Sequence, residues 1–188
     1  MPDITLTPTS PLDGLVLRIG ANQIVERSEL ALTSVAITLG QGDVLARRFQ
    51  ELWGLSLPGA CLTSIAGDWR AVSMTEDQIL LMSPGDGSAV EREVRNRLEG
   101  IGYTTNQTDA WVCLEVSGPD TPAALERICP INLAAGAFPE TASSRTVMEH
   151  MGALVIRTGP EHFLLCSASS SARSFEEAIE TSYRNVIG

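Results

Sequence analysis

Residues 112–120 read Val-Cys-Leu-Glu-Val-Ser-Gly-Pro-Asp, and they repeat the pattern of residues 35–43, Val-Ala-Ile-Thr-Leu-Gly-Gln-Gly-Asp, at an offset of 77. Alternate apolar residues predict a strand in each copy. The expected inward-facing residues are Val35, Ile37 and Leu39 in the first copy and Val112, Leu114 and Val116 in the second. The acidic residues Asp43 and Asp120 follow the glycine turns, where they are placed to cap a helix, and Pro122 suits its first turn.

Two further elements recur in the same order. Residues 79–83, Ile-Leu-Leu-Met-Ser, match residues 163–167, Phe-Leu-Leu-Cys-Ser, at an offset of 84. The apolar stripes of residues 90–101 and 175–186 recur 85 positions apart at helical spacing. This internal repetition predicts an α+β fold of two duplicated ferredoxin-like split βαβ units packed into one compact body.

The repeat also predicts the domain boundaries. Residues 1–13 are rich in Pro, Thr and Ser and form an expected extended arm. The first ferredoxin-like unit is expected over residues 14–104 and the second over 105–188. The repeat offset rises from 76 at Leu133 to 84 at Val155, so the second unit carries an insertion of eight residues. We place it in an inserted loop over 134–146, and long loops in compact domains are usually functional.

Composition excludes several classes of function. The 188 residues include 13 basic and 23 acidic ones, a net charge of −10, so binding to nucleic acid is not expected. Every basic residue is an arginine, which excludes a Schiff-base lysine and a P-loop lysine. The two histidines and four cysteines contain no Cys-x-x-Cys pair and predict no metal site.

Localisation is predicted from the absence of two signals. The first residues lack the basic and apolar segments of a secretory signal peptide. The longest uncharged run, residues 52–67, is interrupted by glycines and Pro58 and is too short to span a bilayer. We therefore expect a cytoplasmic protein that does not enter a membrane.

Three features that resemble catalytic motifs have simpler interpretations. Gly40-Gln41-Gly42 lies between a strand and a helix, but the third glycine of a dinucleotide-binding motif is absent, because residue 45 is leucine. His150 and His162 have no serine or cysteine in a nucleophile elbow to activate. Cys129 is expected at a helix C-terminus, where a thiol gains no reactivity. We therefore predict no catalytic residue and no cofactor in this chain.

Arg145 is the cation of most interest, because it lies in the inserted loop with few other cations near it. A loop arginine can clamp a carboxylate bidentately, within the chain, on a partner protein or on a ligand. A solvated surface position is the remaining interpretation.

Several short motifs resemble a known family. The motifs are Ser10-Pro11-Leu12, Cys129-Pro130-Ile131-Asn132-Leu133, Ala137-Phe138-Pro139 and Ser144-Arg145-Thr146. In this order they resemble the gamma subunit of heterotetrameric sarcosine oxidase, and the likeness covers most of the chain. Asn132 stands where that family usually has Asp, and Gln78-Ile79 stands where a Trp is common.

The resemblance implies a fold like that of the folate-binding aminomethyltransferase and YgfZ-like proteins. It also implies a non-catalytic gamma subunit that docks and stabilises the alpha, beta and delta subunits. Those partners would carry FAD, FMN, NAD and tetrahydrofolate and oxidise sarcosine to glycine with release of hydrogen peroxide. The partner interface is expected to include Pro11, Leu12, Phe138, Pro139 and Arg145.

Two alternatives remain open. The fold resemblance alone also suits a stand-alone tetrahydrofolate-binding module, although the sequence lacks the Cys-Tyr-x-Gly-Gln-type signature of the YgfZ-like proteins. A small homo-oligomeric domain with an unrelated role is the other.

Overall fold

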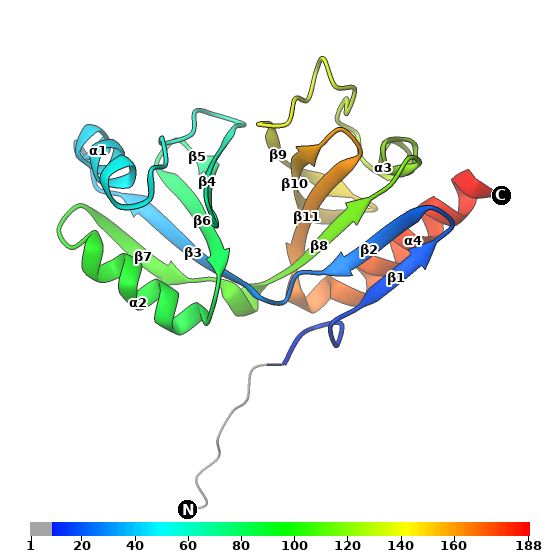
Figure 1. Cartoon of the computed structure of the whole chain (residues 1–188), viewed down its shortest axis with the longest axis horizontal. Coiled ribbons are helices and arrows are strands. Elements are labelled where there is room, and N and C mark those ends of the chain that lie inside the picture. The colour runs from blue at the N-terminus through cyan, green and yellow to red at the C-terminus, as the bar shows by residue number, and fades with distance from the viewer. Residues whose placement is uncertain (1–8) are drawn as a thin grey trace, which may run out of the picture.

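The computed structural model describes residues 9–188, which form two antiparallel sheets and four α-helices (Figure 1). The six-stranded sheet has the order β1-β2-β8-β11-β10-β9, and the five-stranded sheet has the order β4-β5-β6-β3-β7. The strands are β1 (Val16–Ile19), β2 (Asn22–Glu26), β3 (Leu30–Ile37), β4 (Thr63–Ala66), β5 (Trp69–Thr75), β6 (Gln78–Pro84), β7 (Gly102–Asn106), β8 (Trp111–Ser117), β9 (Ser143–Met148), β10 (Met151–Gly159) and β11 (His162–Ala168). The helices are α1 (Gly42–Trp53), α2 (Gly87–Arg97), α3 (Thr121–Ile128) and α4 (Ala172–Ile187).

The five-stranded sheet has the strand order of a ferredoxin-like unit. Strands β3, β5, β6 and β7 take the first to fourth places of that plan, with α1 after the first strand and α2 after the third. All neighbouring strands are antiparallel, and β4 is an additional edge strand. The expected α+β class is therefore confirmed in this half of the molecule.

The six-stranded sheet repeats this plan with one exchange. Strands β8, β10 and β11 take the first three places, with α3 and α4 as the helices and β9 as the additional edge strand. The fourth place, beside β8, is taken by β2, which pairs antiparallel with β8 over Gln23–Glu26. The β1–β2 hairpin, expected in the unit 14–104, thus lies in the sheet of the second unit, since β2 satisfies the free hydrogen-bonding edge of β8.

The two sheets pack face to face with the helices on the outside, which gives four layers. Leu32, Val72, Leu80 and Met82 of one sheet meet Cys113, Leu154, Ile156, Leu164 and Cys166 of the other in one buried cluster. The outer face of the five-stranded sheet is covered by α1 and α2, through Leu45, Phe49, Val94 and Leu98. Helices α3 and α4 cover the outer face of the larger sheet (Figure 1). The units therefore meet through their sheets, and each helix buries its apolar stripe.

Details at the strand ends differ from the sequence prediction. Leu39 is fully exposed, because β3 ends at Ile37 and the chain turns at Gly40 before α1. Asp43 and Asp120 do not cap their helices through their side chains. The Asp120 carboxylate instead accepts a hydrogen bond of 2.9 Å from Asn22 Nδ2, which ties α3 to the β1–β2 hairpin.

The inserted residues are divided between a loop and a longer hairpin. Thr63 pairs with Val72 nine positions later, whereas the corresponding Ser143 pairs with Ile156 thirteen positions later. Half of the insertion therefore lengthens the β9–β10 hairpin. Residues 143–146, expected to be loop, belong to β9, because their alternating polar side chains suit an edge strand.

No helix in the described part of the chain is long and apolar enough to span a membrane.

Candidate partner-binding surface

The histidines and the cysteine singled out in the sequence lie on different elements of the structure. Among residues 9–188, no three His, Cys, Asp or Glu side chains lie close enough to hold a metal ion. His150 is exposed in the β9–β10 turn, and His162 is exposed at the start of β11. Cys129, at the C-cap of α3, is buried, and this burial raises the pKa of its thiol. A buried protonated thiol is a poor nucleophile.

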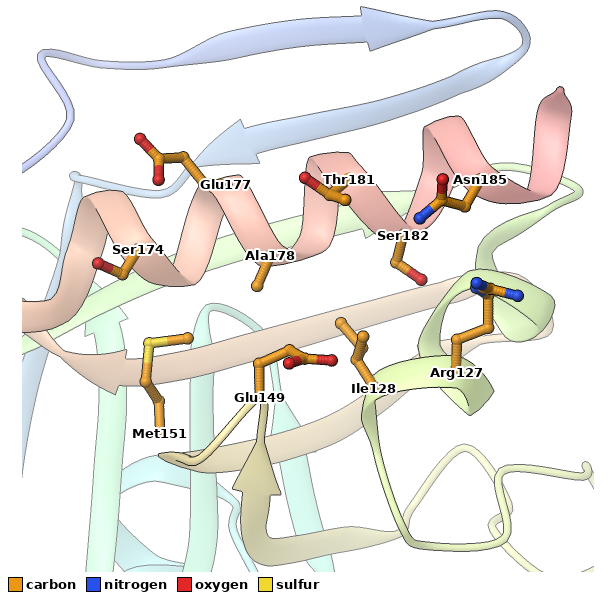
Figure 2. Close-up of a pocket in the computed structure, with 10 residues that line it drawn as sticks. All are labelled: Arg127, Ile128, Glu149, Met151, Ser174, Glu177, Ala178, Thr181, Ser182 and Asn185. Carbon is orange, nitrogen blue, oxygen red and sulfur yellow. The ribbon is translucent and has the colours of Figure 1, made fainter.

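A cavity of about 520 Å³ lies between α4, the end of α3 and the β9–β10 turn. Figure 2 shows its opposing walls, with Ser174, Ala178 and Ser182 of α4 facing Ile128, Glu149 and Met151. Ser182 has the buried hydroxyl of this set, and it already donates a hydrogen bond of 2.6 Å to the carbonyl oxygen of Ala124. This hydroxyl is committed to holding α3 against α4 and is not a free nucleophile.

Arg145 lies on the exposed edge strand β9, where it pairs with Leu154 of β10. Its side chain borders two cavities, of about 590 Å³ on the side of the 57–61 segment and about 320 Å³ on the side of β8 and β11. The guanidinium has no hydrogen-bond or ion-pair partner among residues 9–188. Within this part of the chain it is therefore not an internal clamp.

The internal clamp is a different arginine, Arg157 of β10, which is 3% exposed. Its guanidinium donates to the carbonyl oxygens of Leu133, Gly159 and Pro160 and lies 4.6 Å from the ring centroid of Phe163. Its hydrogen bond to the Leu133 carbonyl oxygen fixes the start of the segment that carries the Ala137-Phe138-Pro139 motif. The position of Arg157 directly after the apolar run of residues 153–156 was the available signal in the sequence.

The segment between α3 and β9 divides into a buried and an exposed part. Phe138 is 7% exposed and belongs to the core beneath α3 and α4, whereas Pro139 is exposed. The Phe138 side chain therefore packs the segment between α3 and β9 against the core of its own chain, and neighbouring residues such as Pro139 are exposed. Asn132 uses its side-chain oxygen to accept a hydrogen bond of 3.0 Å from the backbone N–H of Ala134. An aspartate would accept this bond equally well, so having Asn132 where the family usually has Asp preserves the turn.

The described part of the expected arm begins at Thr9, and residues 1–8 lie outside the described residues. Pro11 is exposed, while Leu12 is 8% exposed and packs in the core of the larger sheet.

The arm is held by the carboxylate of Glu26 at the end of β2, which is 5% exposed. It accepts hydrogen bonds from Ser10 Oγ and from the backbone N–H groups of Leu12, Gly14 and Leu15. Residue spacing gave no signal for this role, because it depends on a contact across more than ten positions.

The two units are joined directly at one edge. Leu62 and Ala142 form an isolated antiparallel bridge, with Thr63 N–H donating to Thr141 O at 2.7 Å and Ser143 N–H donating to Cys61 O at 2.9 Å. This bridge ties the beginning of β4 to the beginning of β9. Pro139 and Arg145, both in the second unit, therefore lie on either side of the point where the two units are joined.

Comparison with known proteins identifies the fold. No protein-family model matches the sequence, and no curated protein matches it. One structural match is a chain of the heterotetrameric sarcosine oxidase from Corynebacterium sp. U-96 in complex with pyrrole 2-carboxylate. It has a TM-score of 0.82 and 16% identity, over 96% of this chain and 97% of that one. The expected similarity of fold is thus confirmed.

The glycine cleavage system aminomethyltransferase T from Bartonella henselae also matches, with a TM-score of 0.60 and 15% identity. This match covers 82% of the present chain but only 44% of the aminomethyltransferase. The present chain therefore has the size of the sarcosine oxidase chain and corresponds to less than half of the aminomethyltransferase.

Proposed function

We propose that this chain is the small, non-catalytic subunit of a cytoplasmic complex of the sarcosine oxidase type. The supporting observation is that its fold corresponds to one chain of a heterotetrameric sarcosine oxidase over nearly the whole length of both. In this proposal FAD, FMN, NAD and tetrahydrofolate reside on the larger alpha and beta and the smaller delta partners. This chain contributes binding surface and stability to the assembly.

The proposed contact surface follows the bridge between the two units. Pro139 and Arg145 lie exposed on either side of the Leu62–Ala142 bridge, and Pro11 is exposed on the arm. Leu12 and Phe138 contribute to this surface indirectly, because their buried side chains hold the arm and the 129–142 segment against the core. A rigid, preformed surface binds with a smaller loss of conformational entropy than a flexible one.

Reconstitution tests the proposal directly. The chain is co-expressed with the larger chains of a sarcosine oxidase encoded in the same genome, and the product is separated by size-exclusion chromatography. We expect a stoichiometric complex that produces hydrogen peroxide from sarcosine. Pro139→Glu combined with Arg145→Glu should reduce assembly, whereas Arg92→Glu on the outer face of α2 should not. Absence of any complex with the unaltered chain would refute the proposal.

The similarity to an aminomethyltransferase supports a second candidate, a stand-alone tetrahydrofolate-binding module. A cavity of about 760 Å³ is lined by Glu26 and Trp111, a carboxylate and an aromatic ring of the kind that suits a pterin. However, Glu26 is already engaged by the arm. Calorimetric titration of the isolated chain with tetrahydrofolate separates the two candidates, and micromolar binding would favour the second.

A further inference from the structure

The cavity of about 320 Å³ beside Arg145 has an unusual lining for a surface of this acidic chain. We call it the Arg145 pocket, and it is lined by Gln107, Ala110, Trp111, Arg145, Thr146, Gly152, Ala153 and Ala168. Most of these side chains are small or apolar. Arg145 is the only charged residue in this lining, although the chain has a net charge of −10.

Gly152 opens the pocket. It lies in β10 opposite Val147 of β9, and a Cβ atom added there would meet no atom within 4 Å. Its φ is not in the left-handed region, so the backbone does not require glycine. Glycine inside a strand weakens the strand and often marks a place where another group approaches closely. Val147 beside it is 52% exposed, which extends the apolar surface to the rim.

The insertion in the second unit creates the strand pair to which Gly152 belongs. Arg70 lies opposite Met82 and Leu154 lies opposite Cys166, so Leu154 is the counterpart of Arg70. Gly152 lies two residues nearer the turn, at a position where the shorter β4–β5 hairpin already turns through residues 67–68. The Arg145 pocket therefore lies beside the part of the β9–β10 hairpin that the first unit does not have.

The charge and shape of the Arg145 pocket indicate what would fill it. A guanidinium without an acidic partner among residues 9–188 is complementary to a carboxylate, which it can bind bidentately. The Trp111 ring and the small alanine side chains are complementary to one apolar side chain. Arginine and tryptophan are the residues that most often contribute large binding energies at protein interfaces.

We propose that the Arg145 pocket receives an apolar side chain and an adjacent carboxylate from a segment of a larger partner subunit. This inference rests on the proposed function, since it names the part of the surface that anchors the partner. The pocket adjoins the Leu62–Ala142 bridge region through Arg145, so the anchor lies at the edge of the surface proposed above.

Two variants and two matched controls test the inference in the assembled complex. Gly152→Leu fills the pocket, and Arg145→Gln removes its charge. Gly42→Leu is the control for the first, because a Cβ at Gly42 also meets no atom within 4 Å, and Arg92→Gln is the control for the second. We expect each test variant to weaken assembly about tenfold or more, with the controls unchanged. Wild-type assembly by a folded Gly152→Leu protein and by Arg145→Gln would overturn the inference.

A second measurement does not depend on the complex. The isolated chain, labelled with ¹⁵N, is titrated with acetyl-Leu-Asp-amide, acetyl-Leu-Lys-amide and acetate, and the Gly152 amide and Trp111 indole signals are followed by NMR. We expect shifts with the Asp peptide alone and their loss in Gly152→Leu. Equal shifts with acetate would identify a small-anion site and overturn the inference, as would no localised shift. If the unaltered chain forms no complex, the proposed function fails and this titration decides the role of the pocket.

Discussion

The guanidinium carbon of Arg157 lies 4.6 Å from the ring centroid of Phe163, inside the core and with no carboxylate partner among residues 9–188. This cation is stabilised by the aromatic face and by three backbone carbonyl oxygens. Its role is to hold the segment after α3 against the larger sheet. The surface proposed to bind a partner depends on this contact, because Pro139 follows directly in that segment.

Replacing Arg157 by methionine should destabilise the protein by about 3 kcal/mol, because buried carbonyl oxygens lose their donors. Urea denaturation gives the free energy of unfolding, and hydrogen exchange should increase first in residues 129–142. Arg157→Lys, which retains the charge but not the planar fork, should show a smaller loss. An unchanged exchange rate in that segment would contradict the clamping role.

Glu26→Gln should loosen the arm. Neutralising the carboxylate weakens the hydrogen bonds from Ser10, Leu12 and Gly14, and we expect a loss of about 1–2 kcal/mol. Limited proteolysis should then cut residues 9–14 faster. Glu161→Gln is the control, because this exposed carboxylate has no side-chain partner among the described residues. Equal cleavage rates in both variants would refute the role of Glu26.

Tyr183 should make stability fall at alkaline pH. Burial raises the pKa of its hydroxyl to about 12 from an ordinary value of 10.0. Between these values the unfolded chain loses the proton while the folded chain keeps it, so the folded state is progressively destabilised as pH rises from about 10 to 12. Below pH 10 this contribution to stability is fully present.

Tyr183→Phe should remove this part of the alkaline dependence, at the cost of the 2.7 Å hydrogen bond with Thr121. The free energy of unfolding is measured from pH 8 to pH 12 in the wild type, in Tyr183→Phe and in Tyr103→Phe. Tyr103, which is 74% exposed, is the other tyrosine of the chain and serves as the control. Identical slopes in all three proteins would show that Tyr183 titrates normally.

The four cysteines should differ sharply in reactivity. Cys61 is exposed, while Cys113, Cys129 and Cys166 are buried. The sulfur atoms of Cys113 and Cys166 lie 3.4 Å apart across β8 and β11, and this hydrogen bond, together with burial, raises the pKa of Cys166 well above its ordinary value. A thiol-specific chromogenic reagent at pH 8 should therefore react rapidly with about one thiol per chain, and the rest should react only in denaturant. Cys61→Ser should abolish the rapid phase, and a second rapid equivalent would contradict the buried positions.

Periodicity and repetition were sufficient for the class of the fold. The buried side of an element can be read from the spacing of its apolar residues. Val112, Leu114 and Val116 alternate along a strand, and Phe175, Ile179 and Tyr183 recur at helical spacing, and all six are buried. Such patterns are local, because each side chain's direction follows from its own backbone. The duplication could be recognised for the same reason, and so could the presence of an insertion in the second unit, but not its division between a loop and the β9–β10 hairpin.

The tertiary structure decided how these elements were combined. Three features depend on which distant strand supplies hydrogen bonds or covers a side chain. They are the pairing of β2 with β8, the exposure of Arg145 on β9 and the burial of Phe138. Many pairings satisfy a strand edge locally, and the choice among them is made by the free energy of the whole packed chain. For the same reason the opening left by Gly152 has no signature in the sequence. It becomes visible only in the register of the β9–β10 hairpin, which extends beyond the corresponding β4–β5 hairpin of the other half of the molecule.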